Sequence, residues 1–183
     1  MDVYATSAAY PWLIELYACA EDSGAVLNVN AEAPEIYLRV GEPDVPVSPA
    51  YQIDEEEIMV VTHRESPVQN MSLEEVRELF AQGNPSGSAQ VWVYSSDADI
   101  QMVFDQLVME GRSVTSFASV AVSPQNMSDV LNSKSNAVGI LPRHWKMGNV
   151  REVFSAGRVP VLAITKPEPQ GAVIELVSCL QNN

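Results

Sequence analysis

The sequence predicts an α/β fold in two lobes, and three observations support this prediction. Short apolar, β-branched runs alternate with amphipathic stretches of about a dozen residues, as strands and helices alternate in proteins with largely parallel sheets. A hydrophobic fraction of 46% with 19% charged residues is typical of a folded globule. Of two long extended runs, residues 51–62 leave the first lobe and residues 158–165 return to it. The expected lobes are therefore residues 1–61 with 158–183, and residues 62–157, joined by a hinge of two crossing strands. The alternative is one doubly wound domain.

The first lobe begins with a strand at residues 2–6 and a helix at residues 7–20. Apolar residues recur along this helix at helical spacing, namely Trp12, Leu13, Leu16, Tyr17 and Ala20. Pro11 fits only within the first turn, where its missing N–H costs little, so the helix starts close to residues 6–8. Further strands are expected at residues 26–30, 35–40 and 51–62.

The second lobe opens with a helix that a capping box starts, because Glu75 follows Ser72 by three residues. Its apolar face consists of Leu73, Val76, Leu79 and Phe80. The next elements are expected in this order: a strand at 90–94, a helix at 97–110, a strand or buried connector at 115–122, a helix at 123–133, and strands at 137–141 and 150–154. The strand at 158–165 then returns to the first lobe, and a helix at 170–180 closes the chain.

The charge balance restricts the partners of this chain. The sequence has 24 acidic and 10 basic residues, a net charge of −14. This excess of acid argues against nucleic acid and anionic membranes as partners, because neutralising phosphates needs clusters of Lys and Arg. An anion site would have to act locally, through backbone N–H groups and hydroxyls.

No catalytic or metal-binding pattern stands out, so we expect no enzyme, no cofactor and no metal site. The chain has no Gly-x-Ser-x-Gly elbow and no Gly-rich phosphate loop. His63 and His144 are isolated, and they do not combine with Cys19 and Cys179 into a zinc motif. The two cysteines either form a disulfide that closes a very long loop or remain buried thiols, and the sequence leaves both open.

Three segments of the second lobe carry a family resemblance. They read SPVQNMSLEEVRELF (66–80), VWVYSSDADIQMVFDQLV (91–108) and NAVGILPRHW (136–145). In this order they resemble the second lobe of type 2 periplasmic substrate-binding proteins, in particular the phosphate-binding-protein-like branch. The resemblance implies a two-lobe fold of the type 2 periplasmic-binding-protein kind. Its function would be to capture a small polar or anionic solute between the lobes for the membrane permease of an ABC transporter.

The same resemblance implies a monomer that works outside the cytoplasm, in the periplasm or at the cell surface. The first ten residues, MDVYATSAAY, have neither the basic region nor the long apolar region of a signal peptide. We therefore expect that a signal segment or a lipid anchor precedes this sequence in the native protein.

The resemblance also implies ligand-binding positions. Thr6, Ser7 and Ala8 match the hydroxyl-bearing turn of the first lobe, and Ser95, Ser96 and Asp97 match the ligand loop of the second lobe, with Tyr94 beside it as a stacking candidate. Gly139 would let the backbone approach a ligand closely, and Arg39 would be an anion partner in the cleft.

Each of these positions also has a purely structural interpretation. Ser7 and Asp97 would be helix N-caps, Tyr94 a core residue, Gly139 a site of tight strand packing, and Arg39 one half of a surface ion pair. Phosphate-binding relatives usually have an Arg and a Ser-Gly-Thr turn in the ligand loop. This chain has neither, and Asp97 and Asp99 would repel phosphate, so the solute stays open.

Two other functions remain as alternatives. One is a ligand-sensing effector domain like that of LysR-type regulators, which shares the two-lobe fold. The other is a scaffold or interaction module without a ligand, whose cleft would be filled by side chains.

Overall fold

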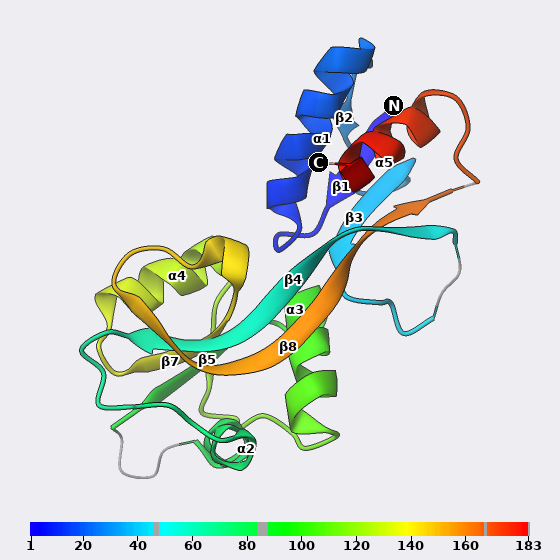
Figure 1. Ribbon diagram of the computed structural model, residues 1–183. Coiled ribbons are helices and arrows are strands. Elements are labelled where there is room, and N and C mark those ends of the chain that lie inside the picture. Colours follow the sequence, from blue (N-terminus) through cyan, green and yellow to red (C-terminus); the bar gives the residue numbers. More distant parts are fainter. Residues whose placement is uncertain (46–47, 84–87, 167, 183) are drawn as a thin grey trace. The chain divides into compact units, whose positions relative to one another are not determined.

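The computed structural model describes residues 1–183 except 46–47, 84–87, 167 and 183. It contains two compact units, which we call unit 1 (residues 1–56 and 159–183) and unit 2 (residues 57–158). Strands β4 (Ala50–His63) and β8 (Val150–Thr165) each continue from one unit into the other (Figure 1). These two strands correspond to the two connecting strands that the sequence predicts.

Unit 1 is an α/β layer with a mixed sheet. Its other elements are β1 (Asp2–Ala5), α1 (Tyr10–Ser23), β2 (Asn28–Val29), β3 (Ile36–Val40) and α5 (Ala172–Asn182). The strand order is β2-β1-β3-β8-β4. Strand β1 pairs in parallel with β2 and β3, whereas β3 and β8 are antiparallel.

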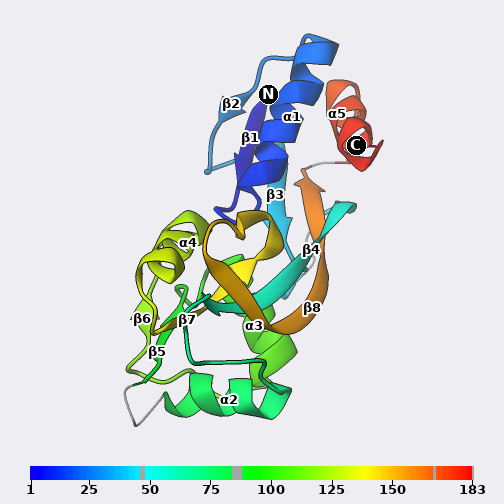
Figure 2. The ribbon, with the colours of Figure 1, turned by 60° about the vertical axis from the view of Figure 1, so that its left-hand side comes forward.

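The core of unit 1 lies between its sheet and the helices α1 and α5, which pack against each other (Figures 1 and 2). Helix α1 contributes Trp12 and Leu16, and α5 contributes Leu176 and Leu180. A disulfide between Cys19 and Cys179 joins the two helices. It answers the question that the sequence left open, in favour of a bond rather than two free thiols.

Unit 2 has the strand order β8-β4-β7-β5-β6. Its strands are β5 (Gln90–Val93), β6 (Ser119–Val120) and β7 (Ala137–Pro142), and its helices are α2 (Leu73–Gln82), α3 (Asp99–Phe104) and α4 (Pro124–Ser133). A π-helical turn, η1 (Asp105–Met109), continues α3, and a 3-10 turn, η2 (Arg143–Trp145), follows β7. Strand β7 is antiparallel to β4 and parallel to β5.

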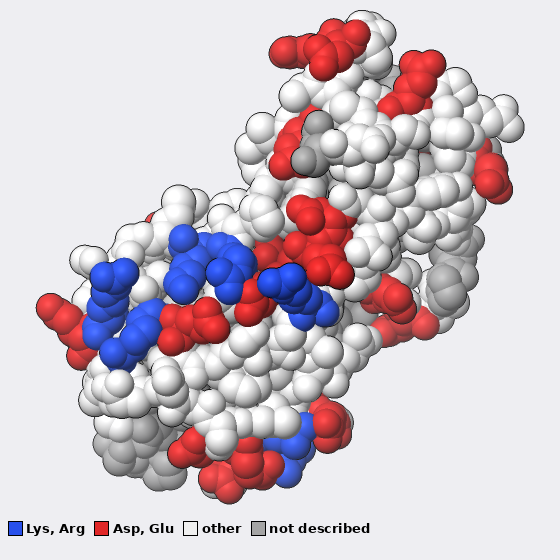
Figure 3. Space-filling view, viewed as in Figure 1, with Lys and Arg blue, Asp and Glu red and all other residues white. Residues whose placement is uncertain are grey.

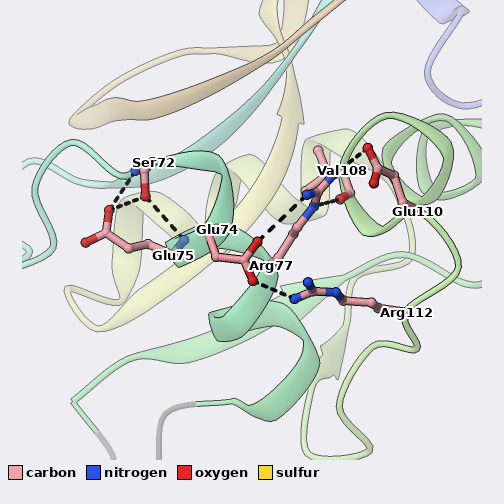
Figure 4. A network of polar contacts seen from close by, with 7 residues as sticks. All are labelled: Ser72, Glu74, Glu75, Arg77, Val108, Glu110 and Arg112. Carbon is pink, nitrogen blue, oxygen red and sulfur yellow. Dashed lines mark hydrogen bonds and ion pairs between the residues drawn. The ribbon is translucent and has the colours of Figure 1, made fainter.

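The start of α2 confirms the capping box. The Ser72 hydroxyl accepts a hydrogen bond from the Glu75 N–H, and the Glu75 carboxylate accepts one from the Ser72 N–H at 2.7 Å (Figure 4). One turn further on, the Arg77 guanidinium donates at 2.5 Å to the Val108 carbonyl and pairs with Glu110, which ties α2 to η1.

Several predicted boundaries were wrong. Strands expected at 150–154 and 158–165 are one strand, β8, because pairing within the sheet keeps the backbone extended; Gly157 lies within it at a φ of +130°, which favours glycine. Helix α1 begins at Tyr10 rather than Ser7, because residues 6–9 form a separate turn. The expected strand at 115–122 is reduced to Ser119–Val120. In the part of the chain that the structure describes, no helix is long and apolar enough to cross a membrane.

Candidate functional site

The first candidate position is the turn between β1 and α1 in unit 1. The Thr6 N–H donates to the Leu38 carbonyl at 3.0 Å, which fixes the turn to β3. The Ala9 N–H donates to the Thr6 hydroxyl at 3.2 Å and to the Thr6 carbonyl at 3.1 Å. Ala9 is the N-cap of α1, so Ser7 is not a capping residue. Ala8 is buried and Ser7 is exposed, which leaves the Ser7 hydroxyl accessible beside the positive end of a helix.

The second candidate position is the turn between β5 and α3 in unit 2. The Ser95 hydroxyl donates to the Asp97 carboxylate, and the Ala98 N–H donates to the Ser95 carbonyl at 3.0 Å. The N-cap of α3 is Ala98, so Asp97 does not cap the helix. Two hydrogen bonds lower the pKa of the Asp97 carboxyl, one from the Ser95 hydroxyl and one from the backbone N–H of Asp97 itself. This exposed turn, which includes Ser96, therefore carries a negative charge at neutral pH.

Tyr94 supports this turn from the core. Its side chain is only 5% exposed, and its hydroxyl donates to the Ile140 carbonyl at 2.8 Å. Burial, with a smaller contribution from Asp99, raises the pKa of the Tyr94 phenol well above its usual value. The ring is thus a core residue rather than a surface for stacking on a ligand.

Gln101 is a positioning residue that the sequence did not reveal. Its amide oxygen accepts from the Tyr94 N–H at 3.0 Å, and its amide nitrogen donates to Asp105 at 2.9 Å. The side chain is buried, so both ends are held in place where β5 gives way to the turn. The only sequence signal was a polar residue next to the apolar stripe of the helix.

Gly139 lies in the middle of β7, where packing explains the glycine. A Cβ atom at this position would lie 2.5 Å from the Met127 sulfur of α4. Every residue of β7 is buried. The structure therefore places Gly139 beneath a helix of unit 2, which agrees with tight strand packing.

Arg39 lies in a pocket of about 1020 Å³ whose lining residues all belong to unit 1. Its side chain is 8% exposed. Its Nε and Nη2 atoms have no hydrogen-bond partner among the described residues, so the expected surface ion pair is not formed by these atoms. Lys166, Tyr4 and Tyr37 line the same pocket, and the sequence did not single out any of them.

The predicted site residues thus fall into two groups, one in each unit. Thr6, Ser7, Ala8 and Arg39 lie on neighbouring parts of unit 1, since β1 and β3 are paired. Tyr94–Asp97 and Gly139 belong to unit 2, where the Tyr94 hydroxyl bonds the residue after Gly139. Among the described residues, no group of three or more His, Cys, Asp or Glu is arranged to hold a metal ion.

Comparison with solved structures shows the fold. No protein-family model and no curated protein matches this chain. A phosphate ABC transporter substrate-binding protein from Clostridium perfringens, with bound phosphate, superposes with a TM-score of 0.83 at 14% identity, covering 98% of this chain and 92% of that one. An ABC-type phosphate transport receptor from Vibrio cholerae matches with a TM-score of 0.74 at 12% identity, over 99% of this chain and 93% of that one.

Regulatory domains match as well. The E204G regulatory domain of OxyR2 from Vibrio vulnificus has a TM-score of 0.73 at 8% identity, over 100% of this chain and 96% of that one. The substrate-binding proteins and the LysR-type regulatory domains share the two-lobe, type 2 periplasmic-binding-protein-like fold. The chain therefore has this fold, as its sequence predicted, and the fold is of a kind used to bind small ligands.

Proposed function

We propose that the chain is an extracytoplasmic solute-binding protein that takes a small polar or anionic ligand. The observation that carries the proposal is that each unit presents an exposed serine-bearing turn between a parallel strand and a helix. Ser7 follows β1 and precedes α1, and Ser96 follows β5 and precedes α3. In open α/β sheets, ligands bind outside the carboxyl ends of strands, where helix N-termini offer unpaired N–H donors.

The disulfide favours a role outside the cytoplasm over a role as a LysR-type sensor. Disulfides persist in oxidising compartments and are rare in the reducing cytosol. The bond between Cys19 and Cys179 involves both cysteines of the chain. The partner in this proposal is the permease of an ABC-type transporter, to which a monomeric receptor would deliver its solute.

The charge of the second turn bears on the class of solute. The pKa of Asp97 is lowered, so this carboxylate opposes a dianion at the turn. The turn also lacks an arginine that would offset the charge. We therefore propose a singly charged or neutral polar solute in preference to phosphate dianion.

A thermal-shift screen tests the proposal. The panel contains phosphate, sulfate, molybdate, amino acids and small carboxylates. A ligand at about 100 times its Kd adds about 2.7 kcal/mol of stability and raises Tm visibly. Ser7→Ala and Ser96→Ala should each weaken binding of the hit by about 1–3 kcal/mol. Ser23→Ala, at the other end of α1, is the matched control and should bind normally.

The outcomes separate the candidate functions. If both serine variants bind like the wild type, the turns are not part of the site. A stable protein that responds to no compound supports the scaffold alternative. A ligand bound by a protein whose cysteines are reduced in its native cell supports the sensor alternative, which the OxyR2 match also favours.

A further inference from the structure

Among the described residues of unit 1, no helix covers one face of the sheet. Helices α1 and α5 pack together over the other face. Strands β2 and β3 lie on either side of β1 and run parallel to it, so the chain must cross β1 to connect them. Parallel crossovers usually take about a dozen residues or more and contain a helix. Here only residues 30–35 make the crossing, and the pocket of about 1020 Å³ lies in the space that remains.

Arg39 lines this pocket, and two of its three guanidinium nitrogens have no hydrogen-bond partner among the described residues. Arg39 projects from β3, 8% exposed, and neither Nε nor Nη2 donates a hydrogen bond within the described residues. Burying a charged group whose donors have no partner is unfavourable. A guanidinium held in this way is preorganised to bind a carboxylate through two parallel hydrogen bonds.

The distribution of charge in the sequence singles out the same place. Of the 10 basic residues, only Arg39 and Lys166 lie within residues 1–56 and 159–183. Both line the pocket. On the face seen in Figure 3, the Lys and Arg side chains gather mainly over unit 2, where Arg143 and Lys146 pair with Glu57 and Glu152. The two basic residues of an otherwise acidic unit thus meet at one cavity.

The rest of the lining defines the body of the ligand. Tyr4 and Tyr37 are directly opposite each other on β1 and β3, and their rings stack with centroids 5.8 Å apart. Leu162 and Ile164 add aliphatic surface from β8. Stacked aromatic and aliphatic side chains bind an apolar body well.

The acidic residues of the lining limit the ligand's charge. Glu32, Glu35, Glu42 and Asp44 also border the pocket. Their field disfavours a multiply charged anion such as phosphate dianion. One carboxylate on an apolar body fits both sets of residues.

We propose that this pocket binds a small monocarboxylate with an aromatic or aliphatic body, whose carboxylate is held by Arg39 and whose body lies on Tyr4 and Tyr37. Lys166 adds positive charge to the lining. None of the lining residues belongs to the turns at residues 6–9 or 95–98, so the pocket is a second site that does not rest on the function proposed above.

Calorimetric titration of the full chain tests this site. The probes are benzoate, phenylacetate and hexanoate, each compared with the neutral amide of the same shape. At least one acid should bind saturably at one site, and its amide should bind at least tenfold more weakly. Arg39→Met should weaken binding of the acid at least tenfold. Arg112→Met, which makes the same charge change in unit 2, should alter the affinity for the acid less than twofold.

A stability measurement distinguishes a ligand-binding role of Arg39 from a purely structural one. Because the arginine is buried without a partner at two of its nitrogens, Arg39→Met should leave the free protein at least as stable as the wild type in urea. Unfolding or marked destabilisation of this variant overturns the assignment.

The titrations give three further outcomes against the proposal. No binding by any of the three acids refutes this ligand class. Equal binding of acid and amide removes the carboxylate from the recognition. Binding that survives Arg39→Met but is lost in Ser7→Ala places the acid at the turn before α1, which supports the proposed function and refutes the separate pocket.

Discussion

Cys19 in α1 and Cys179 in α5 are bonded to each other across a sequence separation of 160 residues. The bond holds together the first and last helices of the chain, which share the core of unit 1. Trp12, on the same helix as Cys19, donates from its indole nitrogen to Asp54 at 2.9 Å. Helix α1 is thus fixed at two points, covalently to α5 and by a hydrogen bond to β4.

Removing the disulfide should destabilise the protein strongly. In the chain-entropy model a loop of this length contributes about 4–5 kcal/mol to the free energy of unfolding. We expect Cys19→Ser with Cys179→Ser to lower that free energy by this order in urea denaturation. Reducing agent should destabilise the wild type equally and leave the double variant unchanged. Identical urea midpoints for the wild type with and without reductant would show that the bond is not formed.

Glu57 should make the stability of unit 2 depend on acid pH. Its carboxylate accepts from the Ser155 hydroxyl at 2.7 Å and from the Arg143 Nε at 2.7 Å. The Ser155 bond and the Arg143 charge lower the pKa of Glu57 against an opposing desolvation effect. The stabilisation is therefore complete above the unfolded-state pKa of about 4.3 and is lost as the pH falls through the lower folded-state value.

The corresponding measurement is urea unfolding of Glu57→Gln between pH 7 and pH 3. At pH 7 the variant should be less stable by about 1 kcal/mol, because a charge-assisted hydrogen bond is lost. The difference from the wild type should shrink as the pH falls below about 4. The exposed Glu78→Gln serves as control, and a difference that does not depend on pH would contradict the assignment.

Asp105 should have the opposite effect. Burial raises the pKa of this carboxyl, although the hydrogen bond from Gln101 counteracts the rise. Its ionised form is therefore disfavoured in the fold, and the penalty is present at neutral pH and absent below the unfolded-state pKa of about 3.9. Asp105→Asn keeps the acceptor for Gln101 and should raise the unfolding free energy at pH 7 by less than about 1 kcal/mol. Asp105→Ala, which leaves the buried amide of Gln101 without this acceptor, should instead destabilise the protein.

Gly139 and Met127 should be coupled energetically. A methyl group at position 139 would lie 2.5 Å from the Met127 sulfur and 3.5 Å from a Leu131 methyl. We expect Gly139→Ala to cost about 1–3 kcal/mol through overpacking. In the Met127→Ala background, which opens that space, the same change should cost clearly less. A double-mutant cycle in urea measures this coupling, and strict additivity would show that Met127 is not the group in contact.

Local signals in the sequence were sufficient to predict much of unit 2. The Ser72–Glu75 capping box and the helix expected at residues 123–133 depend only on neighbours along the chain, and both are found, the latter as α4 with Ser123 as its N-cap. The break expected between residues 154 and 158 was wrong because the pairing of β8 with strands far away in sequence keeps it extended. Periodicity cannot show such non-local pairing.

The site residues were harder to interpret for the same reason. That residues 6–8 and 95–97 lie in turns before helices followed from local composition. The sequence did not show whether Asp97 or the next residue caps the helix, and in the structure the N-cap of α3 is Ala98. The pocket around Arg39 exists because the crossover at residues 30–35 contains no helix. Lys166, which also lines the pocket, lies more than a hundred residues away in sequence. The Cys19–Cys179 bond likewise depends on a distance that no local pattern contains.

Unit 1 is discontinuous in sequence, and this imposes an order on its synthesis. Residues 1–56 leave the ribosome first, but the sheet they belong to lacks β8 until residue 165 has been made, and α5 comes later still. At translation rates of roughly 5–20 residues per second, the apolar faces of α1 and β3 stay uncovered for roughly 6–30 s. Unit 2, which is one continuous segment, has its whole sequence available earlier. The nascent chain therefore passes through a stage in which residues 1–56 are exposed to aggregation and to chaperones, and this stage ends only after Cys179 has been made.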